Sequence, residues 1–506
     1  MTSPTPVTPI DAGPGGVGDH LGGRRVPVSD DLRRRLGDVC AQVSTDDQDR
    51  AEAGRDWWPL AISWAVDGQV PARPAVIARP TDTSQVSAVL SLCDEARVPV
   101  TAAGGRSGVC GASIPVFGGV ALDLCGLAGV GDVDSESLVA DLRAGTFGPD
   151  VEAGLRNGYG LTLGHWPQSM DLSTVGGWLA CRGAGQYSNR YGKIEDMVIG
   201  VEVVLADGSV VRTGGHGPRS ATGPDLTQLF VGSEGTLGVI TEGRFRVHPV
   251  PESEGRRAFG FPSFAGGLDA CRRILRRGAA PAVLRLYDRT ESGRNFDHPD
   301  TNVLIVLDEA DPALVDATIT VVEQECEPAD VLDEQLVERW LGHRNDVSAL
   351  APLWRAGMVV DTAEVSGRWS ALPALYDSVV GALSGIDGTL AASSHQSHAY
   401  ADGACLYFTF AGRPPNADTA GDDANRAWVD HYYRRAWDEV TEATMSAGCA
   451  ISHHHGIGIN RSRFLAEALG SGFPVLSSIK HALDPHGILN PGKLGLDSPF
   501  GPGVWP

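Results

Sequence analysis

The sequence predicts an α+β protein built from two or three domains. Short β-branched runs alternate with helical stretches from Pro74 onward, and glycine-rich segments separate further β-branched runs up to about residue 250. The second half mixes helical stretches with strand-like segments, which is typical of a layered α+β domain. The length of 506 residues also exceeds what one hydrophobic core usually holds.

The composition argues against several classes of function. Acidic residues outnumber basic ones by 63 to 41, and a formal net charge of -22 repels nucleic acid and anionic lipid. The longest apolar runs reach only about ten residues, as at 197–206, which is too short to span a bilayer. The nine cysteines form no CxxC pair, and the first residues lack a signal-peptide pattern. We expect a cytoplasmic protein with reduced thiols, no transmembrane segment and no nucleic-acid partner.

Residues 1–69 are expected to be an extension that is partly disordered and then helical. GPGGVG at 13–18 matches a dinucleotide-binding pattern, but no strand precedes it and no helix follows it, so we assign it no ligand. Apolar spacing predicts a helix within 30–43, and three tryptophans gather in residues 55–64. Both segments are expected to cover the first domain.

Residues 70–254 are predicted to form the first folded domain. The runs AVIARP, SQVSAVLSLCDEARV, PVTAAGG and GVALDL give a βαβ pattern. Further strands are expected at VADLRAG, VIGVEVVLADGSVV and GVITEGRFRVHP, with Asp207-Gly208 at the tip of a hairpin.

Two more segments complete the predicted organisation. Residues 255–440 alternate helical stretches with strand-like PAVLRLYD, NVLIVLDE and ACLYFTFAG, which predicts a second α+β domain. Residues 441–506 contain ISHHHGIG followed by a helical stretch.

Three distant segments, 102–113, 164–185 and 232–241, are dense in glycine and small hydroxyl residues. Glycines let backbone N–H groups approach a diphosphate closely and neutralise its charge without cationic side chains. Each segment alone could be an ordinary tight turn, but three together predict a shared ligand. The hydroxyl donors available to it are Ser107, Ser169, Ser173 and Thr174.

Three sites carry candidate chemistry, and each has a structural alternative. His453, His454 and His455 stand consecutively and could form a metal site, a surface tract or an acid–base group. Since successive residues of a strand face opposite sides, at most two of them are expected to share a pocket. Tyr407 could be a core aromatic residue of a strand, and Arg285 could be an edge-strand residue paired with Asp288.

The order of AAGGRSG, STVGGW and GSEGTLGVIT resembles the FAD domain of the vanillyl-alcohol oxidase and p-cresol methylhydroxylase superfamily. With RYGKIEDMV, APAVLRLYD, DGACLYFTF and SHHHGIG, the chain is similar to alkyldihydroxyacetonephosphate synthase over roughly residues 70–495. The resemblance implies a two-subdomain FAD-binding domain of the p-cresol methylhydroxylase type, completed by the last few dozen residues, plus an α+β cap domain. The FAD-contacting residues that it implies are Thr101, Ala102, Ala103, Gly104, Gly105, Arg106, Ser107, Gln168, Ser169, Ser173, Thr174, Cys181, Arg182, Gly183, Ala184, Glu234, Gly235, Thr236, Leu237, Gly238, Val239 and Ile240.

The resemblance also implies an activity. Enzymes of this family exchange the acyl group of an acylated dihydroxyacetone phosphate for a long-chain alcohol, forming an ether lipid precursor through a flavin N5 adduct. It implies that Tyr407 takes part in proton transfer, that His453, His454 and His455 lie near the flavin ring together with Arg285, and that Thr362 and His398 lie on the substrate side.

The main alternative on the same fold is an FAD-linked oxidase or dehydrogenase of an alcohol or hydroxy acid. Hydroxy-acid dehydrogenases of this fold resemble HxGDGNxH plus GEHGIG, where two histidines and a glutamate hold a divalent metal. Here Tyr407 replaces the second histidine and His454 the glutamate, so no metal is expected. A flavin-loaded binding protein without catalysis is a third alternative.

Three further expectations concern the cofactor, the substrate and the subunits. The first glycine-rich loop has no histidine, and Cys110 lies beyond its diphosphate-contacting part, so FAD is expected to be noncovalent. Leu350 stands where the family has an arginine for the substrate phosphate, with Arg344 and Arg355 on either side, which favours an unphosphorylated substrate. The resemblance also implies a possible homodimer with a small-molecule or lipid-like substrate.

Overall fold

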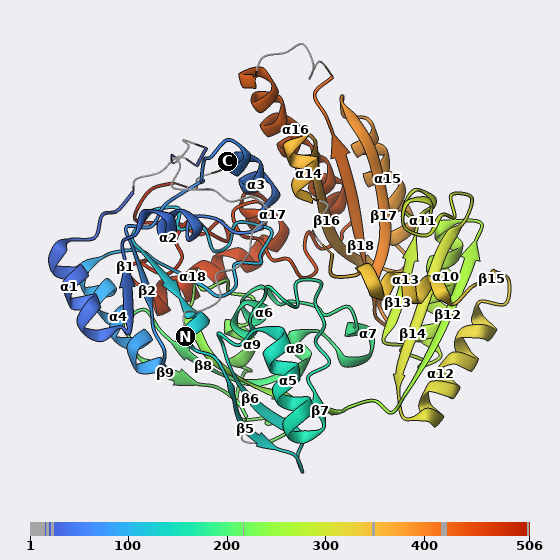
Figure 1. Cartoon of the computed structure of the whole chain (residues 1–506), viewed down its shortest axis with the longest axis horizontal. Helices are drawn as coiled ribbons and strands as arrows, with labels where there is room; N and C mark the ends of the chain where they lie inside the picture. The colour runs from blue at the N-terminus through green and yellow to red at the C-terminus, as the bar shows by residue number, and fades with distance from the viewer. Residues whose placement is uncertain are drawn as a thin grey trace.

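The structure is a computed structural model that describes residues 16, 20–21, 25–215, 217–346, 350–415, 422–502 and 505. Two smaller sheets and a short two-stranded ribbon form one half of the molecule, which we call the flavin domain (Figure 1). A seven-stranded sheet forms the other half, which we call the cap. This arrangement confirms the predicted α+β class.

The first sheet of the flavin domain has the strand order β1-β2-β4-β3. Strands β2 (Val76–Arg79), β4 (Val120–Asp123) and β3 (Val100–Ala103) are parallel, and β1 (Gln42–Ser44) pairs antiparallel with β2. Helix α4 (Thr83–Ala96) connects β2 to β3, and the carboxylate of Asp82 caps it by accepting from the Gln85 N–H. Helix α1 (Asp30–Val39) packs against α4 in the same core, so its prediction is confirmed with an earlier end.

The second sheet is antiparallel, in the order β5-β6-β10-β8-β9. Its strands are β5 (Val130–Asp134), β6 (Val139–Arg143), β10 (Val239–Arg246), β8 (Val198–Val204) and β9 (Val210–Arg212). Gly208 has a φ of +87° at the turn between β8 and β9, as the Asp-Gly signal predicts. The accompanying elements are the helices α5 (Gly148–Tyr159), α6 (Val175–Cys181), α7 (Ser188–Tyr191), α8 (Ile194–Met197) and α9 (Thr227–Phe230), the 3₁₀ turn η1 (Leu124–Gly126), and the ribbon of β7 (Leu161–Thr162) with β11 (His248–Pro249).

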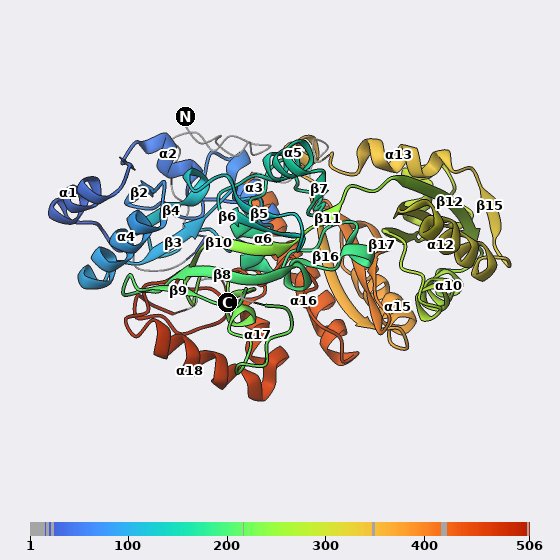
Figure 2. The ribbon, with the colours of Figure 1, turned by 90° about the horizontal axis from the view of Figure 1, so that it is seen from below.

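The cap sheet has the order β15-β12-β14-β13-β17-β18-β16, with every neighbouring pair antiparallel. Its strands are β12 (Ser253–Phe261), β13 (Val283–Tyr287), β14 (Asn302–Ala310), β15 (Asp330–Leu332), β16 (Val359–Arg368), β17 (Thr389–Ala399) and β18 (Gly403–Gly412). Helices α10 (Phe264–Arg276), α12 (Pro312–Glu325) and α15 (Leu372–Ser384) cover one face. Helices α11 (Arg289–Phe296) and α13 (Gln335–His343) cover part of the other, as Figure 2 shows for α13.

The tryptophan segment packs on the first domain, where the Trp57 backbone N–H donates to the Gly108 carbonyl at 2.9 Å, and also on the cap. Helix α2 (Asp47–Glu52) lies near the first sheet, but α3 (Pro59–Val66) joins the cap core beside α14 (Leu350–Arg355). The indole N–H of Trp58 donates to the hydroxyl of Tyr433 at 3.0 Å, and Tyr433 lies on helix α16 (Asp422–Ser446). Sequence periodicity identifies a buried face but not the partner that buries it.

The last part of the chain crosses back to the flavin domain. Helix α16 runs past residue 440, so the boundary expected there divides a helix. A loop over residues 452–458, which we call the histidine loop, leads to α17 (Ser462–Leu469), the 3₁₀ turn η2 (Gly470–Gly472) and α18 (Phe473–Leu483). Leu489 then forms a bridge with Val100 of β3, and Ile488 and Leu489 enter the core of the first sheet.

Two further sequence expectations concern the GPGGVG segment and the membrane spans. The GPGGVG segment lies outside it except for Gly16. None of the helices that the structure describes has both the length and the apolar character needed to cross a membrane.

Candidate active site

The three glycine-rich segments meet beyond the end of β3. A Cβ at Gly104 would lie 2.1 Å from the hydroxyl oxygen of Thr174, and a Cβ at Gly105 would lie 1.9 Å from the carbonyl oxygen of Leu172. Gly235 of the third segment has a φ of +72°, and a Cβ there would have only the Ala102 Cβ within 4 Å, at 3.9 Å. The first segment therefore touches the second directly, and the third approaches the first to van der Waals distance, with open space on the other sides of a Gly235 Cβ.

The side chains around this space fit a polar ligand. The hydroxyls of Thr174 and Ser233 are buried and have no hydrogen-bond partner within the described chain. Two guanidinium nitrogens of Arg106 are in the same state, although Arg106 also forms an ion pair with Asp123 at 3.7 Å. Because buried polar atoms are normally hydrogen-bonded, these groups point to a missing partner with polar atoms. A diphosphate cofactor such as FAD meets that need.

Several predicted cofactor residues serve the protein scaffold instead. The Ser173 hydroxyl donates to the Ser169 carbonyl at 2.8 Å and accepts from the Trp178 indole at 2.7 Å, so it is not a free donor. Glu234 directs its carboxylate to the histidine loop. The side chains of Leu237, Val239 and Ile240 lie in hydrophobic cores, so only their backbone can face a ligand.

The remaining predicted cofactor residues lie on the three segments. Thr101, Ala102 and Ala103 end β3, Ser107 follows Arg106, Gln168 is exposed, Cys181 ends α6, Arg182 is its left-handed cap with a φ of +57°, Gly183 and Ala184 follow it, and Thr236 and Gly238 lead into β10. No single atom of these residues identifies them as ligand contacts, so their roles stay predictions.

Four side chains form a row across the cap sheet. Tyr287 of β13 pairs with His395 of β17, His395 pairs with Tyr407 of β18, and Tyr407 pairs with Glu364 of β16. Cross-strand partners project from the same face. The rings of His395 and Tyr407 stack with centroids 5.0 Å apart and planes at 8°. The row places Tyr407 toward the histidine loop.

The histidine loop is not a strand, and all three rings share one site. The Tyr407 hydroxyl lies 2.7 Å from Nε2 of His454 and 3.0 Å from Nε2 of His455. The Nδ1 atoms of His453 and His454 are 2.8 Å apart. The expectation that at most two of them share a pocket is therefore wrong, because the turns of the loop remove strand alternation.

Glu364 holds this loop from the cap side. Its buried carboxylate accepts from the Ser452 hydroxyl at 3.0 Å and from the backbone N–H groups of His453 and His455 at 2.6 and 2.7 Å. It also pairs with the buried guanidinium of Arg461 at 3.0 Å. Burial opposes ionisation of Glu364, but Arg461 and the histidine-loop groups outweigh it and lower the pKa to about 2.

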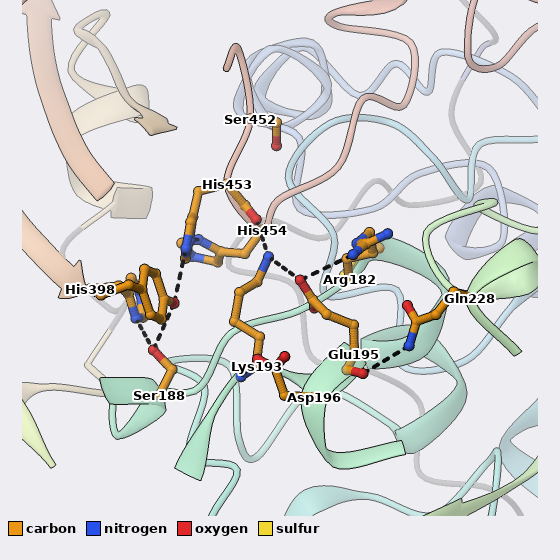
Figure 3. Close-up of polar contacts among 12 residues, drawn as sticks. Arg182, Ser188, Lys193, Glu195, Asp196, Gln228, His398, Ser452, His453 and His454 are labelled. Carbon is orange, nitrogen blue, oxygen red and sulfur yellow. Dashed lines mark hydrogen bonds and ion pairs between the residues drawn. The ribbon is translucent and has the colours of Figure 1, made fainter. Parts of the chain in front are cut away.

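The flavin domain holds the same loop from its other side. The Glu234 carboxylate accepts from the backbone N–H groups of Ile457 and Gly458, at 2.5 and 2.8 Å. The Lys193 ammonium lies between the His453 carbonyl, at 2.6 Å, and the Glu195 carboxylate, at 3.0 Å (Figure 3). Two buried carboxylates and one lysine therefore fix the loop between the two halves of the molecule.

The charge states follow from burial. Burial lowers the pKa of His453 to about 3 and of His455 to about 4, and takes the pKa of His454 well below its usual range. Burial also raises the pKa of the Tyr407 phenol well above its usual value. At neutral pH the site therefore holds neutral imidazoles around a protonated phenol.

Arg285 lies on the inner strand β13, flanked by β14 and β17, so the edge-strand alternative is wrong. Its guanidinium donates to Nε2 of His395 at 2.9 Å, and Nδ1 of His395 lies 2.7 Å from the buried carboxylate of Glu291. The carboxylate requires a proton on Nδ1, which leaves Nε2 as the acceptor for Arg285. Asp288, its expected partner, instead caps α11.

His398 and Thr362 also reach this face. A register shift between Gln396 and His398 pairs His398 with Cys405, and Cys405 and Tyr407 share a face of β18. His398 is 3% exposed, and its Nδ1 lies 2.7 Å from the hydroxyl of Ser188 (Figure 3). Thr362 lies two residues before Glu364 on β16 and therefore shares its face.

Two residues that the sequence did not single out for the site contribute polar atoms. Both ring nitrogens of His165 are buried without a hydrogen-bond partner within the described chain, and burial lowers its pKa to about 3. Its ring lies 4.6 Å from that of Trp178 on α6. Lys193 occurs in the quoted motif RYGKIEDMV, but nothing in the motif shows that it reaches a loop 260 residues away.

Three histidines of the site lie close enough together to bind a metal ion. One ring nitrogen from each of His398, His453 and His454 lies within 4.8 Å of the others, which is close enough to hold an ion. The same side chains form hydrogen bonds to Ser188, Tyr400 and Tyr407. The expectation of a metal-free site stays a prediction.

Together, the glycine-lined space and the Tyr407 site define a flavin-dependent enzyme with a separate cap. The chain matches the family description "FAD binding domain" over residues 74–214 and "FAD linked oxidases, C-terminal domain" over residues 250–494. It therefore belongs to the FAD-linked oxidase family. This result confirms the prediction of FAD as the cofactor and the resemblance drawn from the motifs.

Three relatives show the range of the family. An uncharacterized FAD-linked oxidoreductase of Escherichia coli O157:H7 is 32% identical over 439 residues, which is 83% of this chain and 89% of that protein. An alkyldihydroxyacetonephosphate synthase of Dictyostelium discoideum is 30% identical over 474 residues, 84% of this chain and 74% of that one. A glycolate oxidase subunit of Bacillus subtilis (strain 168) is 28% identical over 475 residues, 92% of this chain and 97% of that one.

Solved structures confirm the predicted fold type. An alkyldihydroxyacetonephosphate synthase superposes with a TM-score of 0.75 at 26% identity, covering 93% of this chain and 86% of that chain. p-Cresol methylhydroxylase with substrate bound superposes with a TM-score of 0.73 at 18% identity, covering 94% of this chain and 99% of that one. The second likeness concerns the fold alone.

Proposed function

We propose that the protein exchanges the acyl group of an acylated dihydroxyacetone phosphate, or of a related ester, for a long-chain alcohol. The observation that carries this proposal is the Tyr407 hydroxyl, held 2.7 and 3.0 Å from Nε2 of His454 and His455. The similarity to alkyldihydroxyacetonephosphate synthases in sequence and structure supports it.

The side chains of the site can move a proton without forming a free phenolate. Tyr407 keeps its own proton at neutral pH, so it acts as a hydrogen-bonded carrier and not as a phenolate base. The neutral imidazole of His454 or His455 accepts the phenol proton while Tyr407 takes a proton from the substrate. Arg285, fixed by His395, supplies a positive charge on the same face of the sheet.

FAD, when bound, supplies an electrophilic ring that can hold a substrate carbon or accept a hydride. We propose that it is bound noncovalently. Cys110 is buried, and burial raises the pKa of its thiol well above the usual value, so it is no ready nucleophile for the cofactor. Release of all yellow colour by acid precipitation supports this proposal, and colour kept in the pellet contradicts it.

Arg344 bears on whether the site can bind a phosphorylated substrate. Leu350 packs against the cap core on α14 and cannot bind phosphate. Arg344, however, stacks over the rings of Tyr187 and Trp340 at 5.0 and 5.5 Å, and its Nη1 is buried without a hydrogen-bond partner within the described chain. Arg285 also lies over the Trp340 ring, at 5.4 Å from its centroid. Arg344 can therefore supply the cation that Leu350 lacks, which removes the main reason to expect an unphosphorylated substrate.

A second candidate function is oxidation of an alcohol or hydroxy acid. The glycolate oxidase relative favours it, since two arginines and neutral histidines also suit an acidic substrate whose hydroxyl must lose a proton. Anaerobic mixing with candidate substrates separates the two functions. Flavin bleaching that only oxygen reverses indicates oxidation, and product formation without oxygen uptake indicates acyl exchange.

Assembly and location are proposals as well. We propose a homodimer in the cytoplasm, and a monomer mass in light scattering at micromolar concentration would exclude the dimer.

A further inference from the structure

Five hydrogen bonds connect Tyr407 to His398 through side chains alone. Tyr407 bonds His454 at 2.7 Å, His454 bonds His453 at 2.8 Å, and His453 bonds the Tyr400 hydroxyl at 3.0 Å. The Tyr400 hydroxyl lies 3.2 Å from that of Ser188, which in turn lies 2.7 Å from Nδ1 of His398. Figure 3 shows Ser188 and His398 at one end of this path and His453 and His454 at the other.

We propose that this chain is a proton path and that Tyr400 and Ser188 are its positioning residues. The inference rests on the proposed proton transfer at Tyr407 and extends it to a second site. It assigns to Tyr400 and Ser188 the task of passing a proton between the histidine loop and His398.

The tautomers allow a net transfer of one proton along the whole path. When Tyr407 donates to Nε2 of His454, His454 donates from Nδ1 to Nδ1 of His453, and His453 donates from Nε2 to Tyr400. Tyr400 then donates to Ser188, and Ser188 donates to Nδ1 of His398. If the substrate gives a proton to Tyr407, each bond passes its own proton one step and His398 becomes protonated. No electron moves, and each intervening group ends neutral.

The same hydrogen bonds can also form with every donor and acceptor exchanged. After the transfer every donor along the path has become an acceptor, so return of the proton from His398 restores the first state. The second bond of Tyr407, to His455, supports both states, because the Tyr407 oxygen both donates and accepts. Burial and the neighbouring His453 and Arg285 lower the pKa of His398 well below its usual value, so a proton that reaches it is held only briefly and returns readily to a leaving group.

Burial shields the His398 end of the path from solvent. Ser188 is 1% exposed and His398 is 3% exposed. The Ser188 backbone belongs to α7 of the flavin domain, whereas Tyr400 follows β17 of the cap and His453 belongs to the histidine loop. Three separate segments therefore contribute to one continuous set of bonds, and the hydroxyl at each junction has a defined partner on both sides.

Ion binding by the histidines is the competing reading of the same cluster. The 2.8 Å between the Nδ1 atoms of His453 and His454 suits a hydrogen bond, whereas tetrahedral bonds of about 2.0–2.1 Å to one zinc ion hold two nitrogens more than 3 Å apart. Among the residues that the structure describes, no carboxylate joins the three histidines that could hold an ion, and Lys193 places a positive charge beside them. Both features favour proton transfer.

The test compares Tyr400→Phe, Ser188→Ala and the double variant in the FAD-loaded enzyme. Each single change breaks the path, so each should lower kcat by roughly 10- to 100-fold and raise the solvent deuterium isotope effect. The double variant should be no slower than the slower single variant, because both changes break the same path. Tyr191→Phe is the matched control, since the Tyr191 hydroxyl bonds Glu309 at 2.7 Å outside the path.

Several outcomes would overturn the proposal. Unchanged kcat in the two single variants would do so while leaving the role of Tyr407 intact. Additive losses with an unchanged isotope effect would show merely structural roles. Stoichiometric metal in the purified enzyme that His398→Gln removes would show an ion site instead. Absorbance shows whether a variant has lost FAD. If Tyr400→Phe or Ser188→Ala loses its FAD, the kinetics of the other single variant decide the test.

Discussion

Glu364 and Tyr407 stand directly opposite each other on β16 and β18, and both reach the histidine loop from the same face of the cap sheet. Glu364 fixes the backbone of the loop, and Tyr407 contacts two of its rings. One cross-strand pair thus combines the group that positions the histidines with the group that works with them.

Replacing Tyr407 by Phe removes the hydroxyl between His454 and His455 and keeps the ring stacked on His395. Turnover should fall by roughly 10²- to 10⁴-fold, the usual worth of a general acid–base group, while FAD stays bound. Steady-state kinetics and flavin absorbance measure both quantities. Isolation of apoprotein would show that Tyr407 supports the cofactor and not the reaction.

Replacing Glu364 by Gln leaves the buried guanidinium of Arg461 without its partner. Removing one member of a buried ion pair costs about 3–5 kcal/mol of folding free energy. Denaturant unfolding should show this loss, and Glu95→Gln, which removes an exposed pair with Arg35, should change little. Equal losses of folding free energy in the two variants would show that Glu364 does not hold the histidine loop and Arg461 in place.

The stability of the His455→Gln variant should depend on pH differently from that of the native protein. Burial lowers the pKa of folded His455 to about 4, against about 6.5 when unfolded. As pH falls from 6.5 to 4, the unfolded chain gains a proton that the folded protein does not, so only the native protein loses this stability. The variant should gain about 3 kcal/mol relative to it over that window. Unfolding curves at pH 7, 5.5 and 4.5 test this, and a constant difference would contradict it.

Valine at position 235 should expel FAD. Gly235 has a positive φ, and a Cβ there would meet only the Ala102 Cβ, at 3.9 Å, so valine both strains the backbone and extends into the expected cofactor space. Gly278 also has a positive φ, of +87°, but nothing lies within 4 Å, so Gly278→Val carries the strain without the cofactor contact. Flavin content after gel filtration should fall only for Gly235→Val. Full occupancy in that variant would place the cofactor elsewhere.

The Arg344→Met variant tests the charge of the substrate. The change removes the guanidinium over Trp340 and keeps an unbranched side chain. The KM for a phosphate ester should rise by roughly 10²-fold, as expected for a lost charged hydrogen bond of about 3 kcal/mol, with little change for the dephosphorylated analogue. If both substrates respond equally, Arg344 does not bind the phosphate. A gain for the phosphate ester in Leu350→Arg alone would support the unphosphorylated substrate.

The sequence predicted the parts of the site that lie within continuous motifs. The glycine segments could be found because their composition suits a diphosphate, and Tyr407 could be found because its motif resembles that of a known family. Glu364 could not, since a glutamate in a strand reads as an ordinary surface residue until Arg461 and the histidine loop surround it. His398 reaches the site face through a register shift in β17, and no local pattern in the sequence marks that shift.

Tertiary contacts also decided two features of the fold. The apolar character of α3 predicted burial, but only the folded chain shows that Trp58 binds Tyr433 of the cap. The histidine triplet could belong to a strand or to a loop as far as its sequence shows. The hydrogen bonds that Glu234 and Glu364 accept from the backbone of the triplet and the residues that follow it hold it as a loop. Long-range hydrogen bonds of this kind have no signature in the spacing of residues.

We propose that Tyr407 and the histidine loop support an acyl exchange without net oxidation. The most direct measurement incubates the FAD-loaded protein with an acylated dihydroxyacetone phosphate and a long-chain alcohol under an oxygen electrode. We predict one fatty acid released for each ether formed, no oxygen uptake, and loss of both products in Tyr407→Phe. Oxygen uptake in step with oxidation of the alcohol, with no ether formed, would contradict the claim and identify an oxidase.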